Sequence, residues 1–215
     1  MITIAKPEVA RAISLELLDV GAIKIRPNEP FKWASGWNSP IYCDNRLALS
    51  FPETRTIIKH YLADVIRSTY PDAQGIAGVA TAGIPQGALV AESLDLPFMY
   101  VRSKPKGHGM ENLVEGKIEK GQKIVMVEDL VSTGGSSIKA AEAIKAAGAE
   151  VLGMAAIFTY GFDVAHENFK KAEIKLVCLS DYTHLLDEAL AKKLIQPDEL
   201  ETLSEWRENP SEWGR

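Results

Sequence analysis

Two spacings of apolar residues alternate along most of the chain. Short continuous apolar runs, typical of buried strands, are followed by stretches in which apolar residues recur every three or four positions, as on one face of a helix. This alternation predicts an α/β fold, with a mostly parallel central sheet of about five strands flanked by helices. The predicted strands and helices occupy residues 75–80, 98–101, 123–127, 151–158 and 174–178, and residues 7–20, 52–69, 84–94 and 136–147, respectively.

Both ends of the chain depart from this alternation. Near the N-terminus, prolines and glycines break the sequence into short pieces, and we expect a hairpin of residues 31–35 and 40–43. Residues 182–215 are expected to be helical and amphipathic. We therefore predict a single domain over residues 1–215, with a small hood subdomain formed mainly by about residues 1–50.

The overall composition is that of a soluble globular protein, with 46% hydrophobic and 25% charged residues. A net charge of −5 argues against a broad nucleic-acid-binding face. No stretch approaches the roughly 20 apolar residues that a membrane span needs, and the N-terminal residues do not resemble a secretory signal. Cys43 and Cys178 show no metal-ligand spacing, as expected of a reduced protein. We expect a cytoplasmic protein that binds neither nucleic acid nor membranes.

The most informative stretch is VEDLVSTGGSS, residues 127–137, which joins a predicted strand to a predicted helix. At the carboxyl end of a parallel strand, the chain enters the crevice where α/β proteins bind ligands. Small residues let several backbone N–H groups converge there, and the start of the next helix favours an anion. Residues 132–136 therefore predict a cup for one phosphate group. The stretch matches neither a P-loop nor the G-x-G-x-x-G pattern of dinucleotide-binding folds.

Two acidic residues, Glu128 and Asp129, stand two positions before this cup. They would repel a phosphate, but carboxylates are strong acceptors for the hydroxyl groups of a sugar. A ribose 5-phosphate carries vicinal hydroxyls a few ångströms from its phosphate, and therefore satisfies both halves of the pattern. The alternative is an ordinary strand-to-helix turn, with acids for solvation and glycines for bending.

A second notable feature is the connection over residues 102–122, which is polar, rich in glycine and unusually long. Long connections inside a compact domain are often lids or binding loops. The part that reads RSKPKGHG brings four cationic or titratable side chains together: Arg102, Lys104, Lys106 and His108. The alternative interpretation is a solvated basic surface loop.

The stretch VMVEDLVSTGGSS resembles the signature of type I phosphoribosyltransferases, which use phosphoribosyl pyrophosphate (PRPP) as the sugar donor. The resemblance implies that fold and Mg²⁺ as the cofactor, held mainly through substrate oxygens and water, with no protein metal ligand assigned. The PRPP-binding residues that it implies are Glu128, Asp129, Leu130, Val131, Ser132, Thr133, Gly134, Gly135 and Ser136, together with Arg102, Lys106 and His108.

Three further segments are similar to the orotate phosphoribosyltransferases within that family. They are FKWASGWNSPIYCDNR at residues 31–46, GVATAGIPQGALVA at residues 78–91, and VRSKPKGHG, followed by LVEG, at residues 101–116. The similarity implies transfer of ribose 5-phosphate from PRPP to orotate in pyrimidine biosynthesis. It also implies a homodimer in which the catalytic loop reaches the partner's site.

By the same similarity, the catalytic residues are Lys106, His108, Arg102 and Asp129, and the orotate-binding residues are Ser132, Tyr42, Arg46 and Tyr160. For Tyr42 the alternative is core packing, and for Arg46 it is a structural ion pair. Ala34, Ala82 and Ser103 stand where many members have a cation, and Tyr160 stands near an expected arginine. Lys32, Arg46 or Lys104 could replace these cations. The rival functions are a purine-type phosphoribosyltransferase and a non-catalytic regulator that keeps the fold and binds RNA or senses nucleotides.

Overall fold

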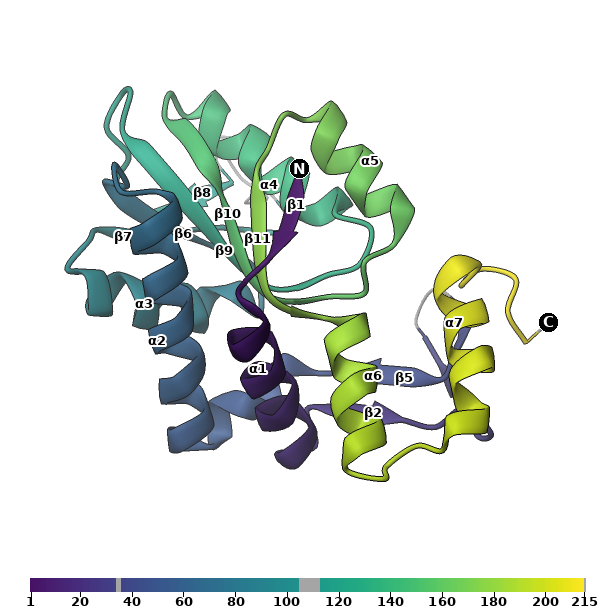
Figure 1. The fold of residues 1–215 in the computed structure, drawn as a ribbon. Coiled ribbons are helices and arrows are strands. Elements are labelled where there is room, and N and C mark those ends of the chain that lie inside the picture. Colours follow the sequence, from purple (N-terminus) through teal and green to yellow (C-terminus); the bar gives the residue numbers. More distant parts are fainter. Residues whose placement is uncertain (34–35, 105–112, 215) are drawn as a thin grey trace.

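The computed structural model describes residues 1–33, 36–104 and 113–214. Within these residues the main element is a seven-stranded sheet in the order β1-β11-β10-β9-β6-β7-β8, parallel throughout except for β8 (Figure 1). This confirms the predicted α/β fold, because the five predicted strands form the centre of the sheet. The strands are β1 (Ile2–Ile4), β6 (Gly75–Val79), β7 (Phe98–Val101), β8 (Val114–Glu115), β9 (Lys123–Val131), β10 (Glu150–Thr159) and β11 (Leu176–Asp181).

The two edge strands, β1 and β8, were not predicted from the sequence. They have three and two residues, so neither is long enough to show a period of its own. β1 is held by its pairing with β11, where Ile2 lies opposite Leu176. Edge strands of this length depend on a neighbouring strand, because a short ladder is not stable in isolation.

Helices cover the sheet on both faces, as expected for parallel strands. One face carries α1 (Pro7–Asp19), α2 (Pro52–Thr69), α3 (Gly83–Leu94) and α6 (Tyr182–Ala191), and the other carries α4 (Gly135–Ala146) and α5 (Asp163–Lys171). β9 contributes to both cores by simple alternation, with Val125 and Val127 in one and Ile124 and Met126 in the other.

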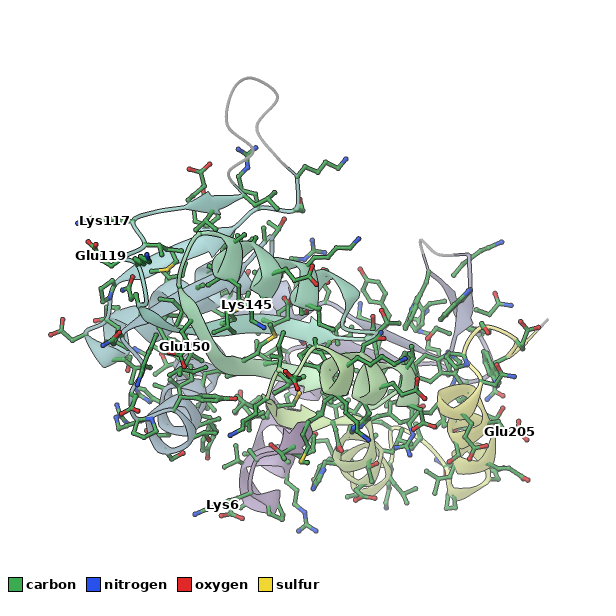
Figure 2. All side chains as sticks on the ribbon, turned by 90° about the horizontal axis from the view of Figure 1, so that it is seen from above. Lys6, Lys117, Glu119, Lys145, Glu150 and Glu205 are labelled. Atoms are coloured by element: carbon green, nitrogen blue, oxygen red, sulfur yellow. The ribbon has the colours of Figure 1, made fainter. Side chains whose placement is uncertain are left out.

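Charged side chains such as Lys6, Lys145 and Glu205 are exposed and project outward from these layers (Figure 2).

The hood is smaller than the predicted range of about residues 1–50, because β1 and α1 belong to the main sheet and its helical layer. What remains is two small antiparallel pairs and a 3₁₀ helix, η1 (Asn45–Ser50). The expected hairpin of residues 31–35 and 40–43 is divided: β3 (Phe31–Lys32) pairs with β4 (Asn38–Ser39), whereas β5 (Ile41–Cys43) pairs with β2 (Ile23–Ile25). The pairing of β5 with β2 brings the buried residues Ile23 and Ile41 onto the core. The division of the chain into one domain with a hood remains a prediction.

In the C-terminal segment, expected to be helical over residues 182–215, the helices occupy parts of residues 182–208. After α6 come a short 3₁₀ helix, η2 (Pro197–Glu199), and α7 (Leu200–Glu208), which lies beside the ends of the hood strands (Figure 1). Trp206 of α7 is fully buried. Over the part of the chain described, no helix is both long and apolar enough to cross a bilayer.

The order of the strands creates one natural place for a ligand. β6 and β9 are neighbours, but the helices that follow them, α3 and α4, lie on opposite faces of the sheet. The two connections therefore diverge beyond the carboxyl ends of these strands and leave a crevice, the usual binding position in open α/β sheets.

Candidate active site

The acidic pair lies inside the last part of β9, because this strand continues to Val131 instead of ending at residue 127 as predicted. Glu128 is buried, and both of its carboxylate oxygens accept hydrogen bonds. The backbone N–H of Asp129 donates to Oε1 over 3.0 Å, and the hydroxyl of Ser137 donates to Oε2 over 3.0 Å. Burial and the neighbouring charge of Asp129 raise the pKa of Glu128 well above its usual value. Burial also raises the pKa of Asp129. Keeping two ionised carboxyl groups at this position therefore costs folding free energy.

The predicted phosphate cup, residues 132–136, forms the turn between β9 and α4. Gly134 has a φ of +80°, and a Cβ atom there would lie 2.6 Å from Cε2 of Phe169, so only glycine fits without strain. The amide of Asn168 on α5 donates to the backbone oxygen of Thr133 over 3.0 Å and so fixes the turn to α5. Because α4 begins at Gly135, its first backbone N–H groups lack partners within the helix and can bind an anion.

On the other side of the crevice, the start of α3 packs directly against β9. A Cβ atom on Gly83 would lie 2.4 Å from the backbone oxygen of Val127, so the absence of a side chain permits this approach. The N-terminal ends of α3 and α4 therefore both lie next to the acidic pair. Their dipoles favour negatively charged groups on a ligand, including groups that the carboxylates by themselves would repel.

A pocket of about 360 Å³ lies between the hood and the sheet. Three of the four predicted orotate-binding residues, Tyr42, Ser132 and Tyr160, line it together. Tyr160 is almost completely buried, and this burial raises the pKa of its hydroxyl well above the usual value. The other residues that line the pocket are Lys32, Trp33, Cys43 and Leu130. We refer to it as the hood pocket.

Comparison with known proteins identifies the family of this chain. A family profile described as the phosphoribosyl transferase domain matches residues 50–190. The orotate phosphoribosyltransferase of Cytophaga hutchinsonii is 62% identical over 205 residues, which cover 95% of this chain and 98% of that protein. The chain belongs to the orotate phosphoribosyltransferase family.

Solved structures agree with this membership. The orotate phosphoribosyltransferase from Aeropyrum pernix is 30% identical, with a TM-score of 0.73, over 82% of this chain and 97% of that chain. The UMP synthase of Leishmania donovani has a TM-score of 0.76 over 92% of this chain, although the match spans only 42% of that larger chain. At 24% identity, this second likeness concerns the fold only.

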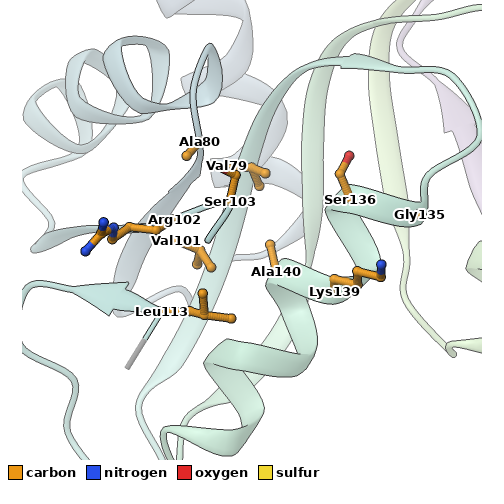
Figure 3. Close-up of a pocket in the computed structure, with 10 residues that line it drawn as sticks. All are labelled: Val79, Ala80, Val101, Arg102, Ser103, Leu113, Gly135, Ser136, Lys139 and Ala140. Carbon is orange, nitrogen blue, oxygen red and sulfur yellow. The ribbon is translucent and has the colours of Figure 1, made fainter. Parts of the chain in front are cut away.

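In this family member, a cavity of about 460 Å³ opens between the ends of β6 and β7 and the start of α4 (Figure 3). Arg102, Ser103, Ser136 and Lys139 are its polar lining residues. The guanidinium of Arg102 lies 3.4 Å from the carboxylate of Glu115 on β8, which places Arg102 at the base of the predicted catalytic loop. Lys106 and His108 lie outside the described residues, so their roles remain predictions from the sequence.

Arg46 is the predicted orotate-binding residue that does not line the hood pocket. Its guanidinium makes two hydrogen bonds to the carboxylate of Asp44, of 2.7 and 2.9 Å, and its side chain is largely exposed. This geometry matches the alternative of a structural ion pair. Lys32 is the cation among the described residues that line the pocket.

Asn45, which lies between Asp44 and Arg46 in the chain, received no role in the sequence analysis. Asn45 is buried, and its amide donates to the backbone oxygen of Asp129 over 2.8 Å. Its own oxygen accepts from the thiol of Cys43 over 3.2 Å. The hood strand and the acidic pair are thereby joined through one side chain. The only local signal was an asparagine two residues after a short strand, which by itself is typical of a turn.

Proposed function

We propose that this protein transfers the ribose 5-phosphate of PRPP to orotate, forming orotidine 5′-monophosphate and pyrophosphate in pyrimidine biosynthesis. The observation that carries the proposal is the position of Ser132, which belongs to the phosphate cup and also lines the hood pocket. A base in the hood pocket would therefore lie next to a sugar phosphate held at the cup. Such proximity is what a transfer between the two molecules requires.

Each part of the crevice has a role in this reaction. The cup at residues 132–136 binds the 5-phosphate through backbone N–H groups, and Glu128 and Asp129 orient the ribose through its hydroxyls. A ring nitrogen of the orotate anion attacks C1 of the ribose while the C1–O bond to pyrophosphate breaks, with inversion at C1. No protein nucleophile is needed, because the nitrogen supplies the electron pair and pyrophosphate leaves with the electrons of the broken bond.

The catalytic loop acts on the leaving group. Negative charge builds up on the pyrophosphate as the C1–O bond breaks, so cations that approach only at that stage stabilise the transition state selectively. We assign this role to Arg102, Lys106 and His108. Closure of the loop would also exclude water, which would otherwise hydrolyse the cationic sugar.

The residues of the crevice fit a magnesium ion that keeps most of its ligands from substrate and water. Among the described residues, no group of three or more acidic, histidine or cysteine side chains could hold a metal. Both oxygens of Glu128 already accept hydrogen bonds, so of the acidic pair Asp129 is the residue that would contact the ion. Mg²⁺ prefers oxygen ligands and gives up its waters reluctantly, so substrate oxygens would complete its shell. When bound, it would neutralise charge on the pyrophosphate.

A homodimer and a cytoplasmic location complete the proposal. The loop that begins at Arg102 leaves the edge of the sheet at β7 and β8, and a loop at an edge can reach a neighbouring subunit. Pyrimidine synthesis and the reduced state of Cys43 and Cys178 fit a cytoplasmic enzyme.

The test is a spectrophotometric assay of orotate consumption in the presence of PRPP, with and without Mg²⁺. We expect turnover of orotate that depends on both PRPP and the metal. Adenine and hypoxanthine serve as alternative substrates in the same assay. Turnover of either purine without turnover of orotate would replace the proposal by a purine-type enzyme.

The non-catalytic rival predicts a different result. A regulator would bind RNA with an affinity that falls steeply as salt increases, because phosphate contacts release counterions. We expect no such binding from a chain with a net charge of −5. Salt-dependent RNA binding without turnover of any base would favour the regulator.

A further inference from the structure

Trp206 of α7 lies directly behind the wall of the hood pocket. Its side chain is fully buried, yet it is not among the residues that line the pocket. It packs against four aromatic rings: Trp33 at 5.7 Å, Tyr160 at 5.5 Å, Phe162 at 5.5 Å and Tyr182 at 5.4 Å between ring centroids. Two of these rings, Trp33 and Tyr160, do line the pocket.

The two lining rings come from different parts of the fold. Trp33 follows β3 of the hood, and its indole N–H donates to the backbone oxygen of Ile41 over 3.1 Å. Tyr160 follows the last residue of β10 in the main sheet. Their centroids are 5.3 Å apart, and Trp206 meets both at nearly perpendicular angles of 85° and 86°. One side chain from the C-terminal helix therefore supports a hood ring and a sheet ring at once.

The position of Trp206 is set by packing and by the anchoring of its helix. Among the described residues, its indole N–H has no hydrogen-bond acceptor, so edge-to-face contacts between rings hold the side chain. The helix is tied by the hydroxyl of Tyr182, which donates to the backbone oxygen of Leu203 over 3.0 Å. Tyr182 is the first residue of α6, and α6 in turn packs against β11 of the main sheet.

The same C-terminal segment is tied to the hood as well. The amide of Asn28 donates to Glu199 over 2.8 Å, and the amide of Asn38 donates to the backbone oxygen of Gly214 over 2.8 Å. The segment therefore spans the hood and the sheet, with Trp206 in the middle. A change in the ring of Trp206 is transmitted to both sides of the pocket, because closely packed interiors have little free space to absorb it.

We infer that Trp206 is a positioning residue for the base: it fixes Tyr160 and Trp33 and thereby sets the shape of the hood pocket without touching the substrate. This rests on the proposed function, in which the hood pocket holds orotate. In the proposed function the sugar phosphate is bound by the cup and the acidic pair, whereas the four rings that pack against Trp206 belong to neither. Trp206 therefore affects the binding of the base more than the binding of PRPP.

The experiment compares Trp206→Leu and Trp206→Phe with Leu203→Ala in the full chain. Leu203 is also fully buried on α7, but its side chain is not part of the ring cluster, so its truncation controls for general loss of stability. For Trp206→Leu we expect the KM for orotate to rise at least fivefold, with the KM for PRPP within twofold of wild type. Trp206→Phe keeps an aromatic ring and should show a smaller increase. Leu203→Ala should leave both KM values within twofold, although it unfolds more easily.

An orotate KM within twofold of wild type in Trp206→Leu, or an equal rise of both KM values, would overturn the inference. Crystal structures of wild type and Trp206→Phe give a readout that needs no activity and no strongly destabilised variant. We expect the rings of Tyr160 and Trp33 to shift toward the space left by the smaller ring, and unmoved rings would count against the inference. If the wild-type protein did not turn over orotate, the proposed function would fail, and the ring positions would still decide whether Trp206 shapes the pocket.

Discussion

The side-chain amide of Asn45 donates a hydrogen bond of 2.8 Å to the backbone oxygen of Asp129. These residues are 84 positions apart in the chain and belong to the hood and to the central strand β9, respectively. The bond joins the part of the site where we place the base to the part where we place the ribose. Asn45 is buried, so water is not available as a substitute donor.

Asn45→Ala should lower the free energy of unfolding by about 1–3 kcal/mol, because a buried carbonyl loses its partner. It should also reduce kcat/KM, since the hood and the acidic pair lose a direct connection. Urea unfolding and steady-state kinetics measure the two effects. Asn28→Ala removes an exposed hydrogen bond of the same length, to Glu199, and should cost less than about 0.5 kcal/mol. Equal losses of stability in the two variants would contradict a special role for the buried bond.

Lys32→Ala should raise the KM for orotate by about 10-fold, equivalent to about 1.4 kcal/mol of binding free energy. Orotate is an anion, and Lys32 is the cation among the described residues that line the hood pocket. Arg46→Ala provides the comparison, and we expect a smaller effect because Asp44 already engages its guanidinium. A larger rise in Arg46→Ala would assign the orotate contact to Arg46, as the sequence predicted.

Glu128 should make the protein less stable as the pH rises. Folding raises its pKa, so its contribution to stability is fully present below the unfolded value of about 4.3 and is lost as the pH rises through the folded pKa. In Glu128→Gln this part of the loss should disappear, which leaves a flatter profile of unfolding free energy against pH. Asp129, whose pKa is also raised, should retain part of the slope.

Urea unfolding at a series of pH values from 4 to 8 measures the contribution of Glu128 to the free energy of unfolding. Glu201→Gln removes one exposed carboxylate on α7 and controls for the loss of a formal charge. Parallel profiles for wild type and Glu128→Gln would show that the buried carboxyl is not the source of the slope.

Two adjacent glycines of the cup should respond differently to alanine. At Gly134 the backbone is left-handed and a Cβ would collide with Phe169, so Gly134→Ala should cost at least about 1 kcal/mol of stability. At Gly135 a Cβ meets nothing within 4 Å, and Gly135→Ala should change stability by less than about 1 kcal/mol. Thermal or urea unfolding distinguishes the two variants, and equal destabilisation would disprove the steric explanation.

Lys106→Ala should lower kcat far more than it weakens the binding of PRPP. Its proposed contact forms mainly when the loop closes over the departing pyrophosphate, so the ground state loses little. Steady-state kinetics give kcat, and calorimetry gives the Kd for PRPP. Lys120→Ala, which removes an exposed cation further along the same connection, is the matched control. An unchanged kcat in Lys106→Ala would refute its catalytic role.

Much of the fold and part of the site could be predicted because their signals are local. β9 with its acidic pair, the glycine turn and α4 follow one another directly within residues 123–146. Even there, the end of β9 was predicted four residues too early, because Glu128 and Asp129 interrupt the apolar run while the ladder with β10 continues beyond them. The position at which this strand ends is therefore set by the extent of its pairing with β10, and not by the polarity of its side chains.

The sequence by itself determined the alternating strands and helices, the acidic pair and the turn that follows it, because nearest-neighbour chemistry and apolar periodicity specify such features. Only the tertiary structure decided that β5 pairs with β2, that Asn45 reaches Asp129, and that Trp206 stands behind Tyr160. These contacts join residues 16 to 84 positions apart in the chain. Their partners are selected by how whole layers pack, and no short stretch of sequence carries that information.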